Sequence, residues 1–172
     1  MTKLYLVRHG EPVDNVRQIL QGQMQGQLNE TGIRQAKQLR DLMASEPIDA
    51  FVSSDLQRSV HTATIIAEPH HLPVHTSYLL RERDWGDFTG SYIPDIQHAV
   101  WPPNVETTGM MRERARRFLH YLRTTYPNQR VLAVGHGIIN KAIQAVFYDR
   151  PMNEVAKMAN AEVRILDVDD RW

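Results

Sequence analysis

The stretch Leu4-Tyr5-Leu6-Val7-Arg8-His9-Gly10 decides the fold, because a short, continuously apolar run that ends in polar residues and a glycine is typical of a strand buried on both faces. The same kind of ending recurs at Val134-Gly135-His136-Gly137. Strands buried on both faces belong to parallel sheets, and the ligands of such sheets lie beyond the carboxyl ends of the strands. The sequence therefore predicts that both histidines lie at one edge of a sheet, where a site is expected.

Helical and strand patterns alternate between and beyond these two stretches. Asn29 can cap a helix whose apolar residues recur at helical spacing up to Met43. Ser54, followed three positions later by Gln57, predicts a capping-box start for a helix that runs to about Ala67. The remaining elements that we expect are strands at 50–52, 130–134 and 163–168, helices from about residue 106 and over 138–147, and irregular segments at 18–27 and 79–105.

This alternation predicts an α/β fold, a three-layer αβα sandwich with a mostly parallel central sheet. The segment 163–168 alternates only partly between apolar and polar residues, so we expect it to be an antiparallel strand at the sheet edge. At 172 residues, with no repeat and no linker composition, the chain is predicted to be a single domain, 1–172, with a short lid or insertion around 83–105.

Composition argues against several classes of function. Lys plus Arg (20) balance Asp plus Glu (20), which removes the main electrostatic argument for a nucleic-acid or membrane partner. The chain has no cysteine, so it has no disulfide framework, thiol nucleophile or zinc–thiolate site. The four apolar residues before Arg8 are too few for a signal peptide, and no stretch has spanning length. We therefore expect a cytoplasmic protein.

Two histidines close to arginines point to phosphoryl transfer. An imidazole nitrogen can attack phosphorus and carry the phosphoryl group as a covalent intermediate. Guanidinium groups match phosphate oxygens, and a neighbouring cation keeps an imidazole neutral and nucleophilic. Arg8 adjoins His9, and Arg58 lies in the first turn of the helix after the second strand. The pattern fits Arg58 equally well as a solvated residue of that helix.

A phosphoryl transfer also needs a carboxylic acid to protonate the leaving oxygen. Glu82 lies in the irregular middle segment beside Trp85, but Glu11 and Asp84 are alternatives, and periodicity does not choose among them. The histidines at 61, 70, 71 and 75 lack helical ligand spacing, so no metal site is predicted. The arginines at 112, 114, 116 and 117 are interpreted as a solvated helix face.

Six segments, in order along the chain, carry a resemblance to a known family: Leu4–Glu11 with Asn15 and Gly22, Leu28–Gly32 with Gln35-Ala36, Ser53–Ser59 with Thr62-Ala63, Leu80–Gly90, Val134–Gly137 and Asn160–Val163. Together they resemble the histidine phosphatase superfamily, in its phosphoglycerate mutase-like branch. The resemblance implies that His9 is phosphorylated and that Glu82 is the general acid. It implies that the phosphoryl oxygens are held by Arg8, Arg58 and His136. The substrate-binding residues expected beside them are Asn15, Gln21, Gly22 and Gly137.

The activity implied by the resemblance is a metal-independent phosphomonoesterase, without cofactor, that acts on a small phosphorylated metabolite through a phosphohistidine. Broad-specificity sugar phosphatases and alpha-ribazole phosphatase are the members most similar in size and in the segment around Glu82. The alternatives are a phosphoglycerate mutase, a protein-histidine phosphatase and a non-catalytic phosphate-binding module. The short segment 91–105, without the mutases' adjacent arginine pair, argues against a mutase. The oligomeric state stays open, with a homodimer as one alternative.

Overall fold

The computed structural model describes all 172 residues and contains one five-stranded sheet with the strand order β3-β2-β4-β1-β5. The strands are β1 (Thr2–Arg8), β2 (Ala50–Ser53), β3 (Val74–Thr76), β4 (Arg130–Gly135) and β5 (Val163–Val168). All neighbouring pairs are parallel except β1 and β5, which are antiparallel. The predicted fold class, including the antiparallel edge strand, is confirmed. The short strand β3 was not predicted.

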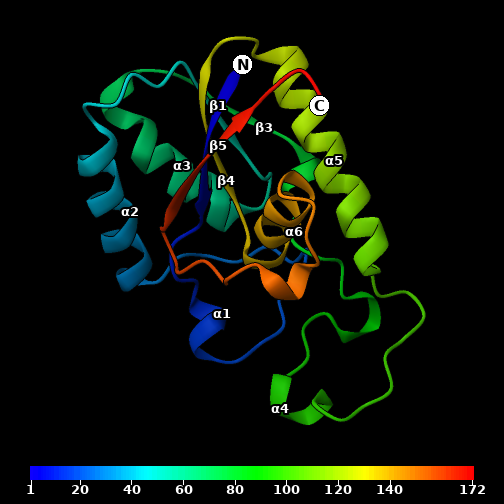
Figure 1. Ribbon diagram of the computed structural model, residues 1–172. Coiled ribbons are helices and arrows are strands. Elements are labelled where there is room, and N and C mark those ends of the chain that lie inside the picture. Colours follow the sequence, from blue (N-terminus) through cyan, green and yellow to red (C-terminus); the bar gives the residue numbers. More distant parts are fainter.

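Helices cover both faces of this sheet (Figure 1). The long helices are α2 (Glu30–Met43), α3 (Gln57–Ala67), α5 (Thr108–Thr125) and α6 (Gly137–Phe147). The chain also has two helices of one turn, α1 (Val13–Val16) and α4 (Ile93–Ile96), and 3-10 turns at 68–70, 78–80, 86–88 and 152–154. Helices α2 and α3 pack on one face and α5 and α6 on the other, so the sheet is the middle of three layers. None of these helices is both long and apolar enough to span a bilayer.

The first strand shows why the sheet is buried on both sides. Leu4 and Leu6 belong to the core on the α5 and α6 face, whereas Tyr5 and Val7 belong to the core on the α2 and α3 face. All four side chains are at most 2% exposed. Successive side chains of a strand point to opposite faces, so a continuously apolar run can fill both cores at once.

Of the two capping signals in the sequence, one predicted a helix start correctly and the other did not. The Asn29 side chain accepts a hydrogen bond from the Gly32 amide at 2.8 Å, and α2 begins at the next residue, as predicted. The capping box predicted at Ser54 is wrong, because α3 begins at Gln57 with no side-chain cap. The Ser54 hydroxyl instead lies against His136 and the Leu56 amide, which is a tertiary role that the local pattern does not show.

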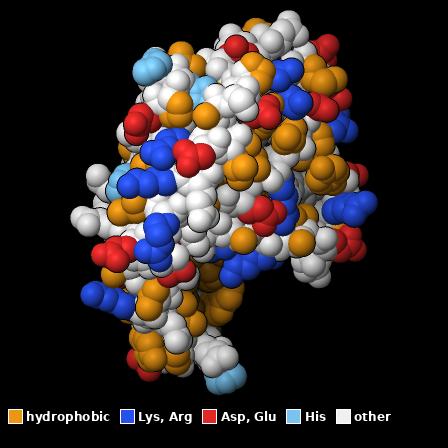
Figure 2. All heavy atoms as spheres, turned by 90° about the vertical axis from the view of Figure 1, so that its left-hand side faces the viewer, with side chains coloured by type: hydrophobic (Ala, Val, Ile, Leu, Met, Phe, Trp, Pro, Cys, Tyr) orange, Lys and Arg blue, Asp and Glu red, His pale blue; other side chains and the backbone are white.

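The carboxyl ends of the central strands lie together at the lower end of the molecule in Figure 1, where Arg8 pairs with Gly135. The segments that contain α1 and α4 extend beyond this end. They are joined by backbone hydrogen bonds from Leu20 to Ser91, from Gly90 to Leu20 and from Ile93 to Gln18, at 2.8–2.9 Å. Figure 2 shows a narrow projection at this end, with a hollow between it and the body above.

Candidate active site

A cavity of about 320 Å³ opens at the carboxyl ends of β1 and β4. It is lined by eight of the nine residues that the sequence assigned to the site, namely Arg8, His9, Asn15, Gln21, Gly22, Arg58, Glu82 and Gly137. The ninth, His136, is completely buried behind them, and its ring centroid lies 4.9 Å from that of His9. The structure thus brings the predicted residues together from four parts of the chain.

His9 lies directly after β1 and is 5% exposed. Its Nδ1 is 2.6 Å from the carbonyl oxygen of Gly10. Because a carbonyl only accepts, Nδ1 carries the proton and Nε2 keeps its lone pair. Burial and then the charge of Arg58 lower the pKa of His9 to about 3, with a smaller contribution from Arg8 in the same direction. The imidazole is therefore neutral at neutral pH, with the lone pair of Nε2 free.

Gly10 holds its carbonyl in place through a backbone contact that only glycine allows. A Cβ atom at this position would lie 2.5 Å from the carbonyl oxygen of Gly32 at the start of α2. The Gly10 amide also donates to the Thr62 hydroxyl at 3.1 Å. The loop after β1 is therefore fixed between α2 and α3, and the orientation of the His9 ring is fixed with it.

His136 is held by two hydroxyl groups. Its Nε2 lies 2.8 Å from the Ser54 hydroxyl and 3.1 Å from that of Ser59. Since the Ser54 oxygen accepts from the Leu56 amide, its hydrogen is free to donate to His136, which puts the ring proton on Nδ1. That Nδ1 is buried and has no partner. Burial and the nearby cationic groups hold the pKa of His136 well below its usual value.

Both arginines are anchored by backbone carbonyl groups, and the Nε of each stays unpaired. Arg58, 2% exposed, donates to the carbonyl oxygens of Met24 and Gly22 at 2.7 and 2.8 Å. Arg8 donates to the Met158 carbonyl at 2.7 Å. The Nε atoms of both are buried without a partner. Burial lowers the pKa of Arg58 to about 10 and lowers that of Arg8, so both remain charged at neutral pH.

Glu82 lies at the amino end of α6. Its Oε1 accepts from the amides of Arg83 at 2.9 Å and Ile139 at 3.0 Å, and both oxygens share the Ile138 amide. Oε2 thus has the freer lone pairs. The first amide of α6, that of Gly137, has no hydrogen-bond partner. Gly137 also packs against Arg8, because a Cβ atom added at this position would lie 3.4 Å from the Arg8 guanidinium. At the amino end of α6, the amides of Ile138 and Ile139 donate to the Glu82 carboxylate, whereas the unpaired amide belongs to Gly137, which lines the cavity.

The other three predicted residues belong to the segment beyond β1. Asn15, in α1, is exposed at the cavity mouth. Gln21 donates to Asp14 at 3.2 Å. Gly22 adopts φ +52°, a left-handed conformation that favours glycine, and its carbonyl accepts from Arg58. In this structure Gly22 acts on the site by anchoring the arginine.

One important residue was misread from the sequence. Arg114, interpreted as part of a solvated helix face, forms an ion pair with Glu106 at 2.9 Å, with side chains 11% and 9% exposed. It comes three residues after Met111 and four before Phe118, both fully buried. That spacing places it on the apolar face of α5 and was the signal available in the sequence.

The histidines weighed as a metal site are not grouped as metal ligands in the structure. His70 contacts the Met43 carbonyl at 3.0 Å and lies beside the Phe51 ring. No group of three or more His, Asp or Glu side chains is arranged to hold a metal ion. Two lysines that the sequence did not single out, Lys141 and Lys157, line the cavity and form no ion pair.

Comparison with known proteins identifies the family. The model of the histidine phosphatase superfamily (branch 1) matches residues 4–171. An uncharacterized phosphatase PhoE of Bacillus subtilis (strain 168) is 33% identical over all of this chain and 92% of its own length. A probable phosphoglycerate mutase GpmB of Proteus mirabilis (strain HI4320) is 34% identical over 80% of this chain and 71% of its own length.

The structural comparison agrees. A mycobacterial glucosyl-3-phosphoglycerate phosphatase, solved in complex with VO3, superposes with a TM-score of 0.87 at 28% identity, over 96% of this chain and 92% of its own. The resemblance inferred from the motifs and the predicted phosphatase class are confirmed. Because the family match covers nearly the whole sequence, this chain belongs to the histidine phosphatase superfamily, branch 1.

Proposed function

We propose that this chain hydrolyses phosphomonoesters by transferring the phosphoryl group to Nε2 of His9 and then to water. One observation carries the proposal: a buried neutral imidazole with a free Nε2 lies in one site with three residues that each have a buried N–H group without a partner. These groups are Nε of Arg8, Nε of Arg58 and Nδ1 of His136. Unpaired buried donors are costly, and three around one nucleophile fit the three oxygens of a phosphoryl group.

The first step forms a bond between His9 Nε2 and phosphorus while the bond from phosphorus to the leaving oxygen breaks. Glu82 gives a proton to that oxygen, and its Oε2 is suited to this because the amides mainly occupy Oε1. The charges of Arg8 and Arg58 balance the negative charge on the phosphoryl oxygens.

In the second step a water molecule attacks phosphorus, and the bond to His9 breaks. Glu82, now ionised, takes the proton of the water, so the carboxylic acid and the neutral imidazole are both restored. Protein groups and water supply every atom and proton of this cycle, and we propose no metal or cofactor. The segment 83–105, joined to residues 18–20, is proposed to act as a short lid.

The cavity wall favours a substrate with a second anionic group. Lys141 lies one helical turn after Gly137 on α6, and Lys157 directly precedes the residue that anchors Arg8. Glu82 is the only acidic side chain that lines the cavity. We therefore propose a small phosphorylated acid, a class that includes phosphoglycerate. The cytoplasm, where such metabolites occur, is the proposed compartment.

A phosphoglycerate mutase is the second candidate, because one relative carries that name and the lysines would suit its substrate. The short segment after Gly90 favours hydrolysis, since a small lid excludes water poorly. Incubation with 3-phosphoglycerate, followed by phosphorus NMR, separates the two. We expect inorganic phosphate, and an isomeric phosphoglycerate formed faster than phosphate would establish the mutase.

The decisive test is phosphate release from a panel of phosphorylated metabolites in the presence of a chelator. We expect His9→Ala to lower turnover by at least about four orders of magnitude, and the surface variant Arg34→Ala to leave it unchanged. Quenching during turnover should trap an acid-labile, alkali-stable phosphoprotein that His9→Ala lacks. Full activity in His9→Ala would overturn the proposal.

A further inference from the structure

Glu82 is carried by a segment without regular structure. Residues 81–85 belong to no helix or strand, so no backbone ladder fixes their path. The carboxylate nevertheless meets the amino end of α6 with both oxygens. Something other than secondary structure must therefore set the position of this segment.

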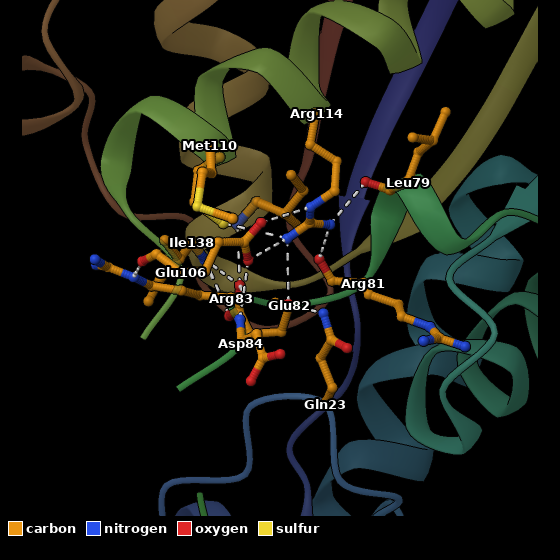
Figure 3. Close-up of polar contacts among 12 residues, drawn as sticks. Gln23, Leu79, Arg81, Glu82, Arg83, Asp84, Glu106, Met110, Arg114 and Ile138 are labelled. Atoms are coloured by element: carbon orange, nitrogen blue, oxygen red, sulfur yellow. Dashed lines mark hydrogen bonds and ion pairs between the residues drawn. The ribbon is translucent and has the colours of Figure 1, made fainter. Parts of the chain in front are cut away.

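Arg114 supplies much of that support (Figure 3). Its guanidinium reaches from α5 and donates to three carbonyl oxygens in and just before the segment, those of Leu79 (3.0 Å), Arg81 (2.6 Å) and Glu82 (3.3 Å). Two further bonds, at 3.0 and 2.9 Å, go to the carboxylate of Glu106. The planar guanidinium can make these bonds together because its N–H groups form a fixed fork.

Glu106 holds the other side of the same segment. Its Oε1 accepts from the Asp84 amide at 2.9 Å, and its carbonyl accepts from Arg83 Nε at 2.8 Å. The Glu106 amide donates to the Asp84 carbonyl at 2.7 Å. The backbone is therefore held before and after Glu82 by the two members of one buried ion pair.

We propose that Glu106 and Arg114 are positioning residues for proton transfer by Glu82. Neither lines the cavity that holds His9, so they act through the acid and leave phosphate capture to other groups. Misplacing a general acid slows departure of basic leaving groups, which need a proton, and spares acidic ones, which leave as anions. The inference rests on the proposed function, in which Glu82 protonates the leaving oxygen.

The test compares kcat/KM for phenyl phosphate and for 2,4-dinitrophenyl phosphate, because kcat/KM reports the steps up to leaving-group departure. We expect Arg114→Lys to lower the value for phenyl phosphate about 10- to 100-fold and that for the dinitrophenyl ester less than about threefold. Glu106→Gln keeps the shape and the acceptor for Asp84 and should show the same selectivity, less strongly. Arg116→Lys, in an exposed pair with Glu113 on the same helix, is the matched control and should change neither value.

Three outcomes decide the matter. The positioning role would be overturned if kcat/KM fell equally for both esters in Arg114→Lys and Glu106→Gln, or did not fall at all. A urea titration of each variant shows whether a loss of activity comes from a loss of folding. Glu82→Gln must itself show the leaving-group selectivity, and its absence would overturn the acid assignment in the proposed function. Selectivity in Glu82→Gln without selectivity in the other two variants would overturn the further inference alone. The double variant Glu82→Gln/Arg114→Lys should be no more selective than Glu82→Gln.

Discussion

The candidate active site has two parts that are held in different ways. We call them the histidine half, which contains His9 and His136, and the acid half, which contains Glu82. His9 and His136 follow adjacent buried strands, and the register between β1 and β4 already brings them together. Glu82 lies on an irregular segment, and side chains from α5 and from the residues just before α5 hold that segment in place. One half is positioned by the sheet, whereas the other is positioned by a buried pair of charges.

This difference predicts different weaknesses. The histidine half depends on close backbone contacts, so added volume should damage it most. The acid half depends on charged side chains. It should therefore be damaged most by loss of a charge or by loss of the planar guanidinium that makes several hydrogen bonds at once. Arg58 depends on neither kind of support, because it extends from α3 and is anchored by the carbonyls of the segment beyond β1. The variants below test this division.

Among the variants that test this division, the largest effect is expected for Arg58→Ala. Loss of a charged donor to the phosphoryl oxygens should lower kcat/KM by about two to three orders of magnitude. The loss should be similar for phenyl and dinitrophenyl phosphate, unlike the loss in Arg114→Lys. Steady-state kinetics with both esters measures it, and a selective loss would place Arg58 with the acid half. Arg34→Ala is the exposed control, because the hydrogen bond of this side chain goes to its helix neighbour Thr31.

Gly10→Ala should damage the histidine half through volume alone. The new Cβ would meet the Gly32 carbonyl at 2.5 Å, backbone against backbone, so β1 and α2 must separate. We expect the free energy of unfolding to fall by about 1–3 kcal/mol in a urea titration. Gly109→Ala in α5, where the nearest atom would be 3.9 Å away, should instead raise it by about 0.5–1 kcal/mol. Equal stability of the two variants would contradict the close contact.

The pH dependence of stability reports the burial of the histidine half. The pKa of His9 is about 3 in the fold, and that of His136 is also lowered. Below about pH 6.5 the unfolded chain binds protons that the folded chain does not, so stability falls as the pH falls. Each histidine contributes a slope of up to about 1.4 kcal/mol per pH unit. Urea titrations between pH 7 and 5 should show a shallower slope in His9→Gln, and an unchanged slope would show that folding does not lower the pKa of His9.

The smallest effect concerns the tautomer of His136. Ser54→Ala removes the hydroxyl at 2.8 Å and leaves that of Ser59 at 3.1 Å. Loss of one hydrogen bond of about 1 kcal/mol should lower kcat about fivefold. Ser45→Ala, at an exposed position, is the control. Removal of both hydroxyls in Ser54→Ala/Ser59→Ala should lower kcat further. If it does not, the hydroxyls do not determine which ring nitrogen of His136 carries the proton.

Periodicity predicted the histidine half but not the support of the acid half. A continuously apolar run is a local signal, so β1, β4 and the positions of His9 and His136 could be read directly. The carbonyl groups that accept from Arg114 lie 32 to 35 residues earlier in an aperiodic segment, and no local pattern links them to Arg114. Ser54 failed as a cap for the same reason, because its partner His136 is 82 residues away.

The backbone bonds between the segments at 18–20 and 90–93 have a kinetic consequence. Since Leu20 bonds to both Ser91 and Gly90, neither segment can leave the cavity mouth without breaking bonds to the other. The two should open as one cooperative unit, and the amide protons of Leu20, Gly90 and Ile93 should exchange with solvent at a common rate. Entry of the ester and departure of phosphate would then require the same opening of these two segments. The rate of that opening is an upper limit on the rates of both steps.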